Sequence, residues 1–260
     1  MSLNIVSLAS GSKGNSTLVF SDSTALLVDA GISYSALNAA LGKFGLSVAK
    51  LDGVVVTHEH TDHIAALPRV GKETSIYAHP KTAEAIVHKQ GVLYGYKEVE
   101  FYEGGFTVGD IEVIPFRIPH DAAYPLGYSF RLKTGAQVSV ATDMGRPTVG
   151  VYNNIRESEA VLIEANHDVE MLKNGPYPER LKRRILGDLG HLSNDMTAVF
   201  AERLVNSAVK TMLLGHLSEN NNLPCLAVGA VAGRLRGRGC TDISVAAASQ
   251  YEISEVYEVK

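Results

Sequence analysis

The segment VVVTHEHTDHIAAL, at residues 54–67, constrains this chain most, because it places three histidines and an aspartate within six positions. Its apolar start predicts a buried strand, and its apolar end predicts a helix that begins near His63. While the segment stays extended, His58 and His60 face the same side, because side chains alternate with a period of two. The bend into the helix then presents Asp62 and His63 at a second point nearby. Imidazole nitrogens and carboxylate oxygens suit borderline-soft cations, so the segment predicts a site for two metal ions.

The chain has 260 residues, of which 45% are hydrophobic and 20% charged, and this composition suits a folded domain with a sizeable core. We find no repeat or linker and expect one domain, residues 1–260. No apolar stretch is long enough to predict a transmembrane helix, and the N-terminus lacks the features of a secretion signal. The two cysteines, Cys225 and Cys240, form no C-x-x-C motif. Their spacing favours a reduced, cytoplasmic location, with no membrane as partner.

Strand and helix signals alternate along the chain. Several β-hairpins are mixed with surface helices, which favours an α/β fold arranged as an αββα sandwich over a simple parallel sheet. Ser33 is expected to cap a helix that Gly45 ends, and Gly91 to end another that follows Pro80. The predicted strands cover residues 3–8, 16–20, 24–28, 51–56, a short segment near 76, 99–102, 111–118, 126–132, 138–141, 160–164 and 210–214, and two further helices cover about 179–186 and 195–208.

The pattern H-x-H-x-D-H after an apolar strand resembles the signature of the metallo-β-lactamase superfamily, which implies the αββα sandwich and a dinuclear metal site. The resemblance extends to three further segments in which a ligand follows an apolar strand: FRIPHD, VSVATDMG and KTMLLGHLS. It implies His58, His60 and His120 as ligands of one metal, Asp62, His63 and His216 as ligands of the other, and Asp143 as the ligand of both. Zn²⁺ is favoured by this donor set, and Mn²⁺ or Fe²⁺ would also be accommodated.

The chain also resembles the ribonuclease Z-like, YycJ/WalJ-type branch of that superfamily. The resemblance rests on ASGSKGNST near the start, on the long block at 164–194 and on LGHLSENNNLP at 214–224. It implies a nuclease with 5′-to-3′ exonuclease action on DNA. It also implies that His191, which precedes the penultimate helix, assists catalysis without being a main ligand. Asp29 in LLVDAG matches an aspartate that supports the ligands, although a turn carboxylate explains it equally well.

The implied chemistry is the hydrolysis of a phosphodiester. Two metal ions close together lower the pKa of a bridging water and supply hydroxide near neutral pH. Asp62 would help to orient the hydroxide that attacks phosphorus. His191 would steady a non-bridging oxygen or protonate the leaving oxygen.

Contacts to the substrate are predicted in two places. The loop SGSKGNS at 10–16 could offer Ser10 and Asn15 to a phosphate, or it could be a plain tight turn. In the basic cluster RLKRR, Lys182 and Arg184 are expected to contact the nucleic-acid backbone, with a solvated surface as the alternative. His167 is expected to cap a helix or line the groove, not to bind metal.

Three other functions remain open from the sequence. One is a different hydrolase of the same fold, such as a cyclic phosphodiesterase, lactonase or thioesterase; the block at 164–194 argues for the phosphodiesterase side. Another is a tRNA-processing ribonuclease, although no Gly/Pro-rich excursion resembles a tRNA-binding arm. A third is a metal-stabilised binding or regulatory module, which the complete set of seven ligand positions disfavours.

The net charge of −4 argues against a general nucleic-acid coat protein but permits a local basic groove.

Overall fold

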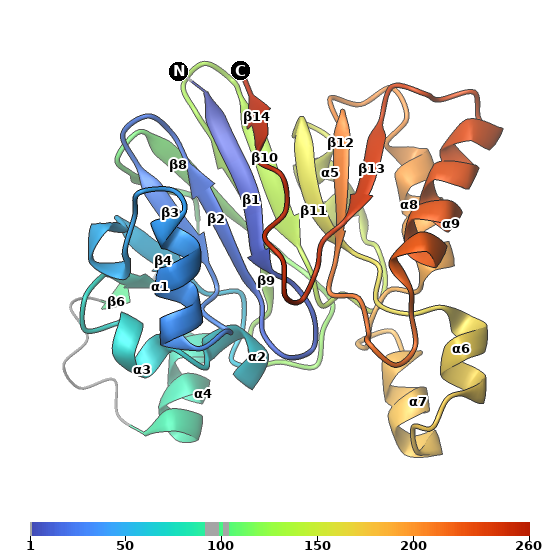
Figure 1. Ribbon diagram of the computed structural model, residues 1–260, viewed down its shortest axis with the longest axis horizontal. Coiled ribbons are helices and arrows are strands. Elements are labelled where there is room, and N and C mark those ends of the chain that lie inside the picture. The colour runs from blue at the N-terminus through green and yellow to red at the C-terminus, as the bar shows by residue number, and fades with distance from the viewer. Residues whose placement is uncertain (1, 92–98, 101–103) are drawn as a thin grey trace.

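Two mixed β-sheets pack face to face and helices cover both outer faces, as Figure 1 shows for the computed structural model. The model describes residues 2–91, 99–100 and 104–260. This arrangement confirms the predicted αββα sandwich. The described ends of the chain lie side by side, because the last strand pairs with the first.

The first sheet is built from the N-terminal part of the chain and its last strand. Its strands pair antiparallel from the last strand to the third, and parallel from the third strand onward. In spatial order they are β14 (Tyr257–Val259), β1 (Leu3–Ala9), β2 (Ser16–Phe20), β3 (Ala25–Val28), β4 (Gly53–Val55), β5 (Ile76–Tyr77) and β6 (Val99–Glu100).

The second sheet has the same arrangement of strands and is built from the rest of the chain. It has an antiparallel half followed by a parallel half. In spatial order its strands are β13 (Ser244–Ala247), β12 (Thr211–Gly215), β11 (Ala160–Glu164), β10 (Gln137–Ala141), β9 (Leu126–Arg131), β8 (Ile111–Arg117) and β7 (Phe106–Val108).

The helices form an outer layer on each sheet, and two of them stand apart at one end of the sandwich (Figure 1). The layer on the first sheet consists of α1 (Tyr34–Gly42), η1 (Val48–Lys50), α2 (Thr61–Ile64), α3 (Leu67–Val70) and α4 (Pro80–Gln90); the layer on the second consists of α5 (Val149–Ile155), α8 (Asn194–Arg203) and α9 (Pro224–Gly237); and the pair at the end is α6 (Val169–Asn174) and α7 (Glu179–Ile185).

Three buried apolar clusters lie between these layers. They form because successive side chains of a strand point to opposite faces of its sheet. In β1, Ile5 belongs to the cluster between the sheets, whereas Val6 belongs to the cluster under the helices of the first sheet. In β4, Val55 points between the sheets and Val54 points to the helices. Each such side chain contributes about 1.5–3 kcal/mol on burial, so strands that are apolar on both faces belong inside a four-layer sandwich.

Most predicted strands are confirmed within one or two residues, whereas several helix boundaries are wrong. The helix after the histidine cluster begins at Thr61, two residues before the predicted start near His63. The helix capped by Ser33 ends at Gly42, before Gly45, and α8 ends at Arg203, five residues before the predicted 208. Residues 101 and 102 of the predicted strand 99–102 lie outside the described residues.

Helix α9 is the clearest omission of the sequence interpretation. Its three glycines lower its helix propensity. It forms because Ala227, Val231 and Leu235, spaced by four, pack on the second sheet. Within the described residues, every helix is too short or too polar to cross a lipid bilayer.

Candidate metal centre

The seven predicted ligands converge at one end of the sandwich, because each follows the end of a strand. His58 comes after β4, and His120, Asp143 and His216 come after β8, β10 and β12. Asp143 and His216 take left-handed backbone conformations, with φ of 60° and 55°, and so does Asp29 after β3 at 60°. Such conformations cost non-glycine residues free energy and cluster at functional sites. They accompany contacts at the strand ends, where Oδ1 of Asp143 lies 3.5 Å from Nδ1 of His216 and Oδ2 of Asp29 lies 2.7 Å from Nδ1 of His63.

Backbone contacts hold the histidine-rich segment against the neighbouring loops. The Asn15 amide donates to the Asp62 carbonyl over 2.8 Å, and the Ala30 amide donates to the His63 carbonyl over 2.8 Å. A Cβ atom on Gly31 would lie 1.7 Å from the Asp62 carbonyl oxygen, so only glycine allows this close approach. The segment is therefore positioned by the fold and not by its own short helix.

The first donor set consists of His58, His60 and His120. The Nε2 atom of His58 lies 3.0 Å from Nδ1 of His60, which lies 3.2 Å from Nε2 of His120. The Nδ1 atom of His120 faces two backbone carbonyls, at 3.1 and 3.2 Å, so it carries the proton and leaves Nε2 as a lone pair. Three ring nitrogens so close to one another match the spacing of about 3.3 Å expected between nitrogen ligands of tetrahedral Zn²⁺.

The second donor set consists of Asp62, His63, Asp143 and His216, whose ligand atoms lie within 4.8 Å of one another. Nε2 of His63 is 3.2 Å from Oδ2 of Asp143, and Nε2 of His216 is 3.4 Å from Oδ2 of Asp62. Nearby imidazoles, those of His216 and His63, offset the effect of burial and hold the pKa of Asp143 well below its usual range. Asp143 is therefore an anion at neutral pH.

Asp143 also reaches toward the first donor set, because its Oδ1 lies 3.9 Å from Nε2 of His120. Its Oδ2 is buried and makes no hydrogen bond among the described residues, because the nearby Nε2 of His63, at 3.2 Å, is the unprotonated ring nitrogen when Nδ1 donates to Asp29. A buried anionic oxygen without a hydrogen bond is costly unless a cation meets it. Together with the converging imidazole nitrogens, this oxygen shows that the residues fit a dinuclear metal site.

Asp29 and Thr57 orient two of the predicted ligands, His63 and His58. Asp29 Oδ2 accepts hydrogen bonds from Nδ1 of His63 at 2.7 Å and from Thr57 Oγ1 at 2.8 Å. The Thr57 hydroxyl in turn accepts from Nδ1 of His58 at 3.0 Å. Both histidines are thereby held as tautomers with Nε2 toward the metal site. Of the two explanations for Asp29, support of a ligand is the one its contacts favour.

Asp29→Asn should lower metal affinity by about 10- to 100-fold, because an amide oxygen holds the His63 proton less strongly than a carboxylate. The measurement is a titration of the metal-loaded protein with a competing chelator. Asp22→Asn, in the exposed turn between β2 and β3, is the control for a lost surface charge. Equal chelator resistance of Asp29→Asn and the native protein would remove Asp29 from this role.

Glu164 joins the metal site to His191, and the sequence interpretation did not assign it. The carboxylate is fully buried at the end of β11. Its Oε1 accepts from Nδ1 of His191 at 2.7 Å and from Nδ1 of His216 at 2.9 Å. Burial opposes ionisation, but the His191 imidazole outweighs it and lowers the pKa of Glu164 to about 2. Since the carboxylate holds the Nδ1 proton, Nε2 is the ring nitrogen that His191 offers to a substrate.

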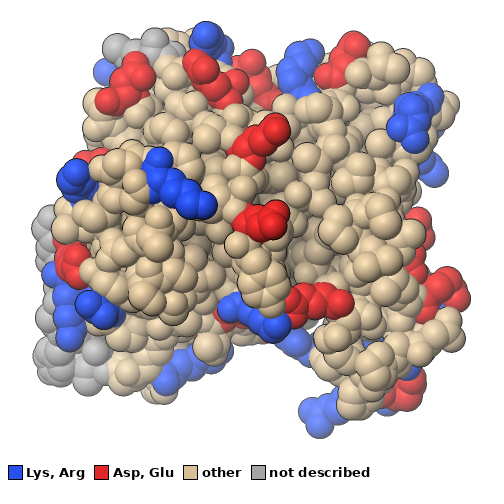
Figure 2. All heavy atoms as spheres, in the orientation of Figure 1, with Lys and Arg blue, Asp and Glu red and all other residues tan. Residues whose placement is uncertain are grey.

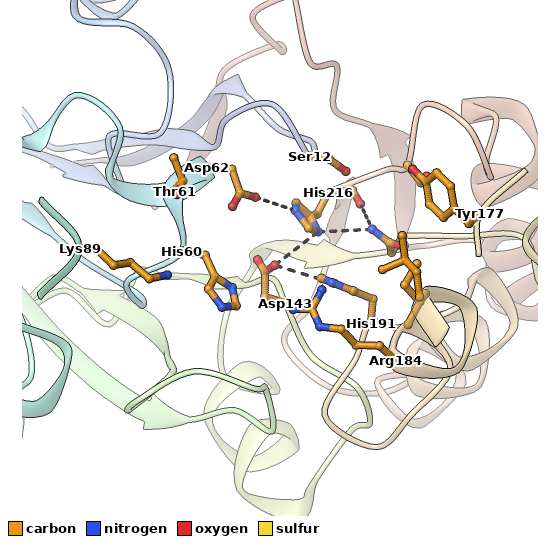
Figure 3. A pocket seen from close by; sticks show the side chains of 14 residues that line it. Ser12, His60, Thr61, Asp62, Lys89, Asp143, Tyr177, Arg184, His191 and His216 are labelled. Atoms are coloured by element: carbon orange, nitrogen blue, oxygen red, sulfur yellow. Dashed lines mark hydrogen bonds and ion pairs between the residues drawn. The ribbon is translucent and has the colours of Figure 1, made fainter. Parts of the chain in front are cut away.

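A cavity of about 350 Å³ opens over these residues. Figure 3 shows His60, Asp62, Asp143, His191 and His216 across its floor. Two cations flank them, Lys89 from α4 and Arg184 from α7, and Tyr177, Leu181 and Ile185 line the side formed by the segment that carries α7.

Each of the two cations is tethered beside a ligand. Lys89 Nζ donates to the carbonyl of Glu59, within the histidine-rich segment, over 3.2 Å. Arg184 binds both carboxylate oxygens of Asp121, next to His120, over 2.6 and 2.8 Å. Over the described residues of the face in Figure 2, basic and acidic side chains are interspersed. Lys89 and Arg184 thus place cationic groups at two sides of the cavity, and Asp121 balances the charge of Arg184.

Three predicted substrate contacts lie elsewhere. Ser10 and Asn15 are buried behind the ligands: Ser10 Oγ accepts from the His216 amide at 2.8 Å, and Asn15 Nδ2 lies 3.4 Å from Oδ2 of Asp62. Lys182 Nζ donates to the Lys173 carbonyl and to Glu179, over 2.7 and 3.1 Å. These side chains brace the site and the α6–α7 segment instead of facing a substrate, whereas Arg184 does line the cavity.

His167 lies just outside this set. It is buried, neither ring nitrogen has a hydrogen-bond partner among the described residues, and its backbone carbonyl accepts from the Asn194 amide. Burial lowers its pKa to about 4. The cap of α6 is the neighbouring Asp168, so the expectation that His167 caps this helix is wrong.

The chain is similar to proteins of one family along most of its length. A family model described as a beta-lactamase superfamily domain matches residues 24–217. The chain is 38% identical over 242 residues to exodeoxyribonuclease YycJ of Bacillus anthracis, covering 92% of this chain and 91% of that protein. It is 37% identical over 225 residues to exodeoxyribonuclease WalJ of Streptococcus pneumoniae serotype 2, with coverages of 85% and 83%. A crystal structure of a diphosphatase from the PhnP family has the same fold, with a TM-score of 0.68, 17% identity and coverages of 100% and 98%.

Proposed function

The chain belongs to the β-lactamase superfamily, and we propose that within it the protein is a metal-dependent hydrolase of phosphodiesters, a 5′-to-3′ exonuclease acting on DNA. The observation that carries the proposal is the meeting of two donor sets at Asp143, under a cavity flanked by Lys89 and Arg184. Such a site suits an anionic ester. The names of the relatives with 38% and 37% identity support the choice of DNA.

The proposed ligands are those that the sequence implied. His58, His60 and His120 would hold one divalent ion, Asp62, His63 and His216 the other, and Asp143 both. Two such ions would polarise a phosphoryl oxygen and supply hydroxide near neutral pH. We propose Zn²⁺, because the donors are imidazoles and carboxylates, a set that also accommodates Mn²⁺ or Fe²⁺. Two free thiols, at Cys225 and Cys240, support a cytoplasmic location.

The protein's own side chains would position the substrate and move the proton. Lys89 and Arg184 attract the phosphates on either side of the scissile bond. The Asp62 carboxylate, on the cavity wall, orients the attacking water. His191 Nε2 donates a proton to the leaving oxygen, while Glu164 holds Nδ1 and keeps the ring in place.

The test is a panel of end-labelled, 5′-phosphorylated DNA and RNA, single- and double-stranded, assayed with Zn²⁺ or Mn²⁺. We expect stepwise release of nucleotides from the 5′ end of DNA and weaker action on RNA. Asp143→Asn, prepared in the same way, is the control for contaminating nucleases. Elemental analysis of the same preparation should give two metal ions per chain.

Further substrates are assayed beside this panel, and each outcome would assign a different function to the protein. Hydrolysis of a cyclic phosphodiester, a lactone or a thioester, with polynucleotides left intact, would make the protein a different hydrolase of this fold. Cleavage confined to the 3′ trailer of a tRNA precursor would make it a tRNA-processing ribonuclease. Metal binding with no turnover of any ester would leave a regulatory module.

A further inference from the structure

One wall of the cavity differs from the others in chemistry. The floor and the remaining sides carry predicted ligands, hydroxyls, an amide and Lys89, whereas α7 and the loop before it contribute Arg184 and the apolar surface of Tyr177, Leu181 and Ile185. Tyr177 and Leu181 are partly exposed and belong to none of the three apolar clusters of the described residues. Their apolar surface is therefore not used to hold the sandwich together. It faces the cavity beside the metal site.

Tyr177 lies on a connecting loop that contacts the loop after His216. Its hydroxyl accepts a hydrogen bond from Asn220 Nδ2 over 3.0 Å, within the loop that follows ligand His216. Gly175, two residues earlier, packs so closely on Asn221 that a Cβ atom would lie 2.5 Å from its Oδ1. Lys182 ties the two helices together through the carbonyl of Lys173. The loop that carries the ring is thus held against the loop after His216, which lowers the cost of ordering it when a ligand binds.

The cations define how a polynucleotide would reach this wall. Figure 3 shows Lys89 beyond His60 on one side of the floor, and Arg184 and Tyr177 on the opposite side. A backbone that runs from Lys89 over the ligands places its next nucleoside between Arg184 and Tyr177. Arg184 can meet the phosphate while the base lies on the tyrosine ring. Aromatic side chains bind unpaired bases in this way without regard to sequence.

We propose that Tyr177, with Leu181, is the stacking surface for the unpaired base of the terminal nucleotide at the end that is hydrolysed. This inference rests on the proposed function and adds to it a requirement for a single-stranded end that carries a base. A duplex end would have to fray before its base could reach the wall. The site would therefore select the state of the DNA end and not its sequence.

The test compares Tyr177→Ala with Tyr177→Phe on two single-stranded oligonucleotides, one ending in a normal nucleotide and one in an abasic residue. Binding is measured by fluorescence anisotropy in the metal-loaded His191→Ala protein, so that affinity is read apart from hydrolysis. Tyr177→Ala should weaken binding of the normal end by about 5- to 150-fold and leave the abasic end unchanged. Tyr177→Phe keeps the ring and should bind the normal end almost as the parent does.

Two results would overturn the inference. An equal loss on both oligonucleotides would make Tyr177 a structural residue of the loop, and no loss on either would place the base elsewhere. Neither result touches the proposed function, which depends on hydrolysis of DNA by the unaltered protein. Conversely, an unaltered protein that leaves DNA intact would reject the proposed function whatever the anisotropy shows.

Discussion

Asp143→Ala is expected to remove most of the bound metal and with it nearly all hydrolysis. The Asp143 carboxylate is the group whose two oxygens face both donor sets, with Oδ2 near His63 and Oδ1 near His120. Loss of a residue that only supports a ligand already costs about 10- to 100-fold in metal affinity, so loss of a shared anion should exceed about 100-fold. Elemental analysis after gel filtration measures the metal content.

A second variant at position 143 is needed because of the left-handed backbone conformation there. Its φ of 60° is unfavourable for alanine, which could unfold the loop, but asparagine tolerates this conformation well. Asp143→Asn therefore removes the charge and keeps the local backbone. Two metal ions per chain in a folded Asp143→Asn protein, shown by an unchanged thermal melting curve, would contradict the role of Asp143 as the ligand shared by both ions.

His191→Ala is expected to keep both metal ions and lose about 10²- to 10⁴-fold in turnover, the usual contribution of a general acid. The reason lies in its contacts: Nδ1 is bound to Glu164 at 2.7 Å, and the ring lines the cavity between His120 and His216 without belonging to the two proposed ligand sets. The measurement is kcat on DNA at a verified metal content.

The control is His88→Ala, an exposed histidine in the last turn of α4 beside Lys89. It removes an imidazole near the cavity without touching the metal site, so its turnover should match that of the native protein. If His191→Ala loses a metal ion, His191 is a ligand. If it retains full turnover, His191 is a structural residue.

Features of the fold and the site that are set by residues close together in the sequence were predictable. The strands are short runs rich in apolar and β-branched residues between turn signals, and four of the seven predicted ligands occupy a single short segment. The roles of His120, Asp143 and His216 were predicted from the resemblance to the superfamily, but each residue also follows the end of an apolar strand. The same signal could have found Glu164, which ends the apolar run AVLIE of β11.

Patterns that depend on distant segments were not predictable. Lys89 lies in the last turn of an ordinary amphipathic helix, and only the packing of α4 brings it to the cavity. Ser10, Asn15 and Lys182 had the right chemistry for a phosphate, yet other parts of the chain already use their hydrogen bonds. Tyr177 had no sequence signal, because nothing local distinguishes it from the other ten tyrosines.

The sequence by itself determined the layered fold and the kind of atoms that a metal would meet, since both follow from residue spacing along single strands. The tertiary structure alone decided which side chains share one cavity and which of them form internal hydrogen bonds instead. It alone also showed that Glu164 connects His191 to His216. The physical reason is that metal ligation, proton transfer and base stacking act over a few ångströms. Those distances are set where strand ends and loops from both sheets meet, and no single stretch of the chain contains them.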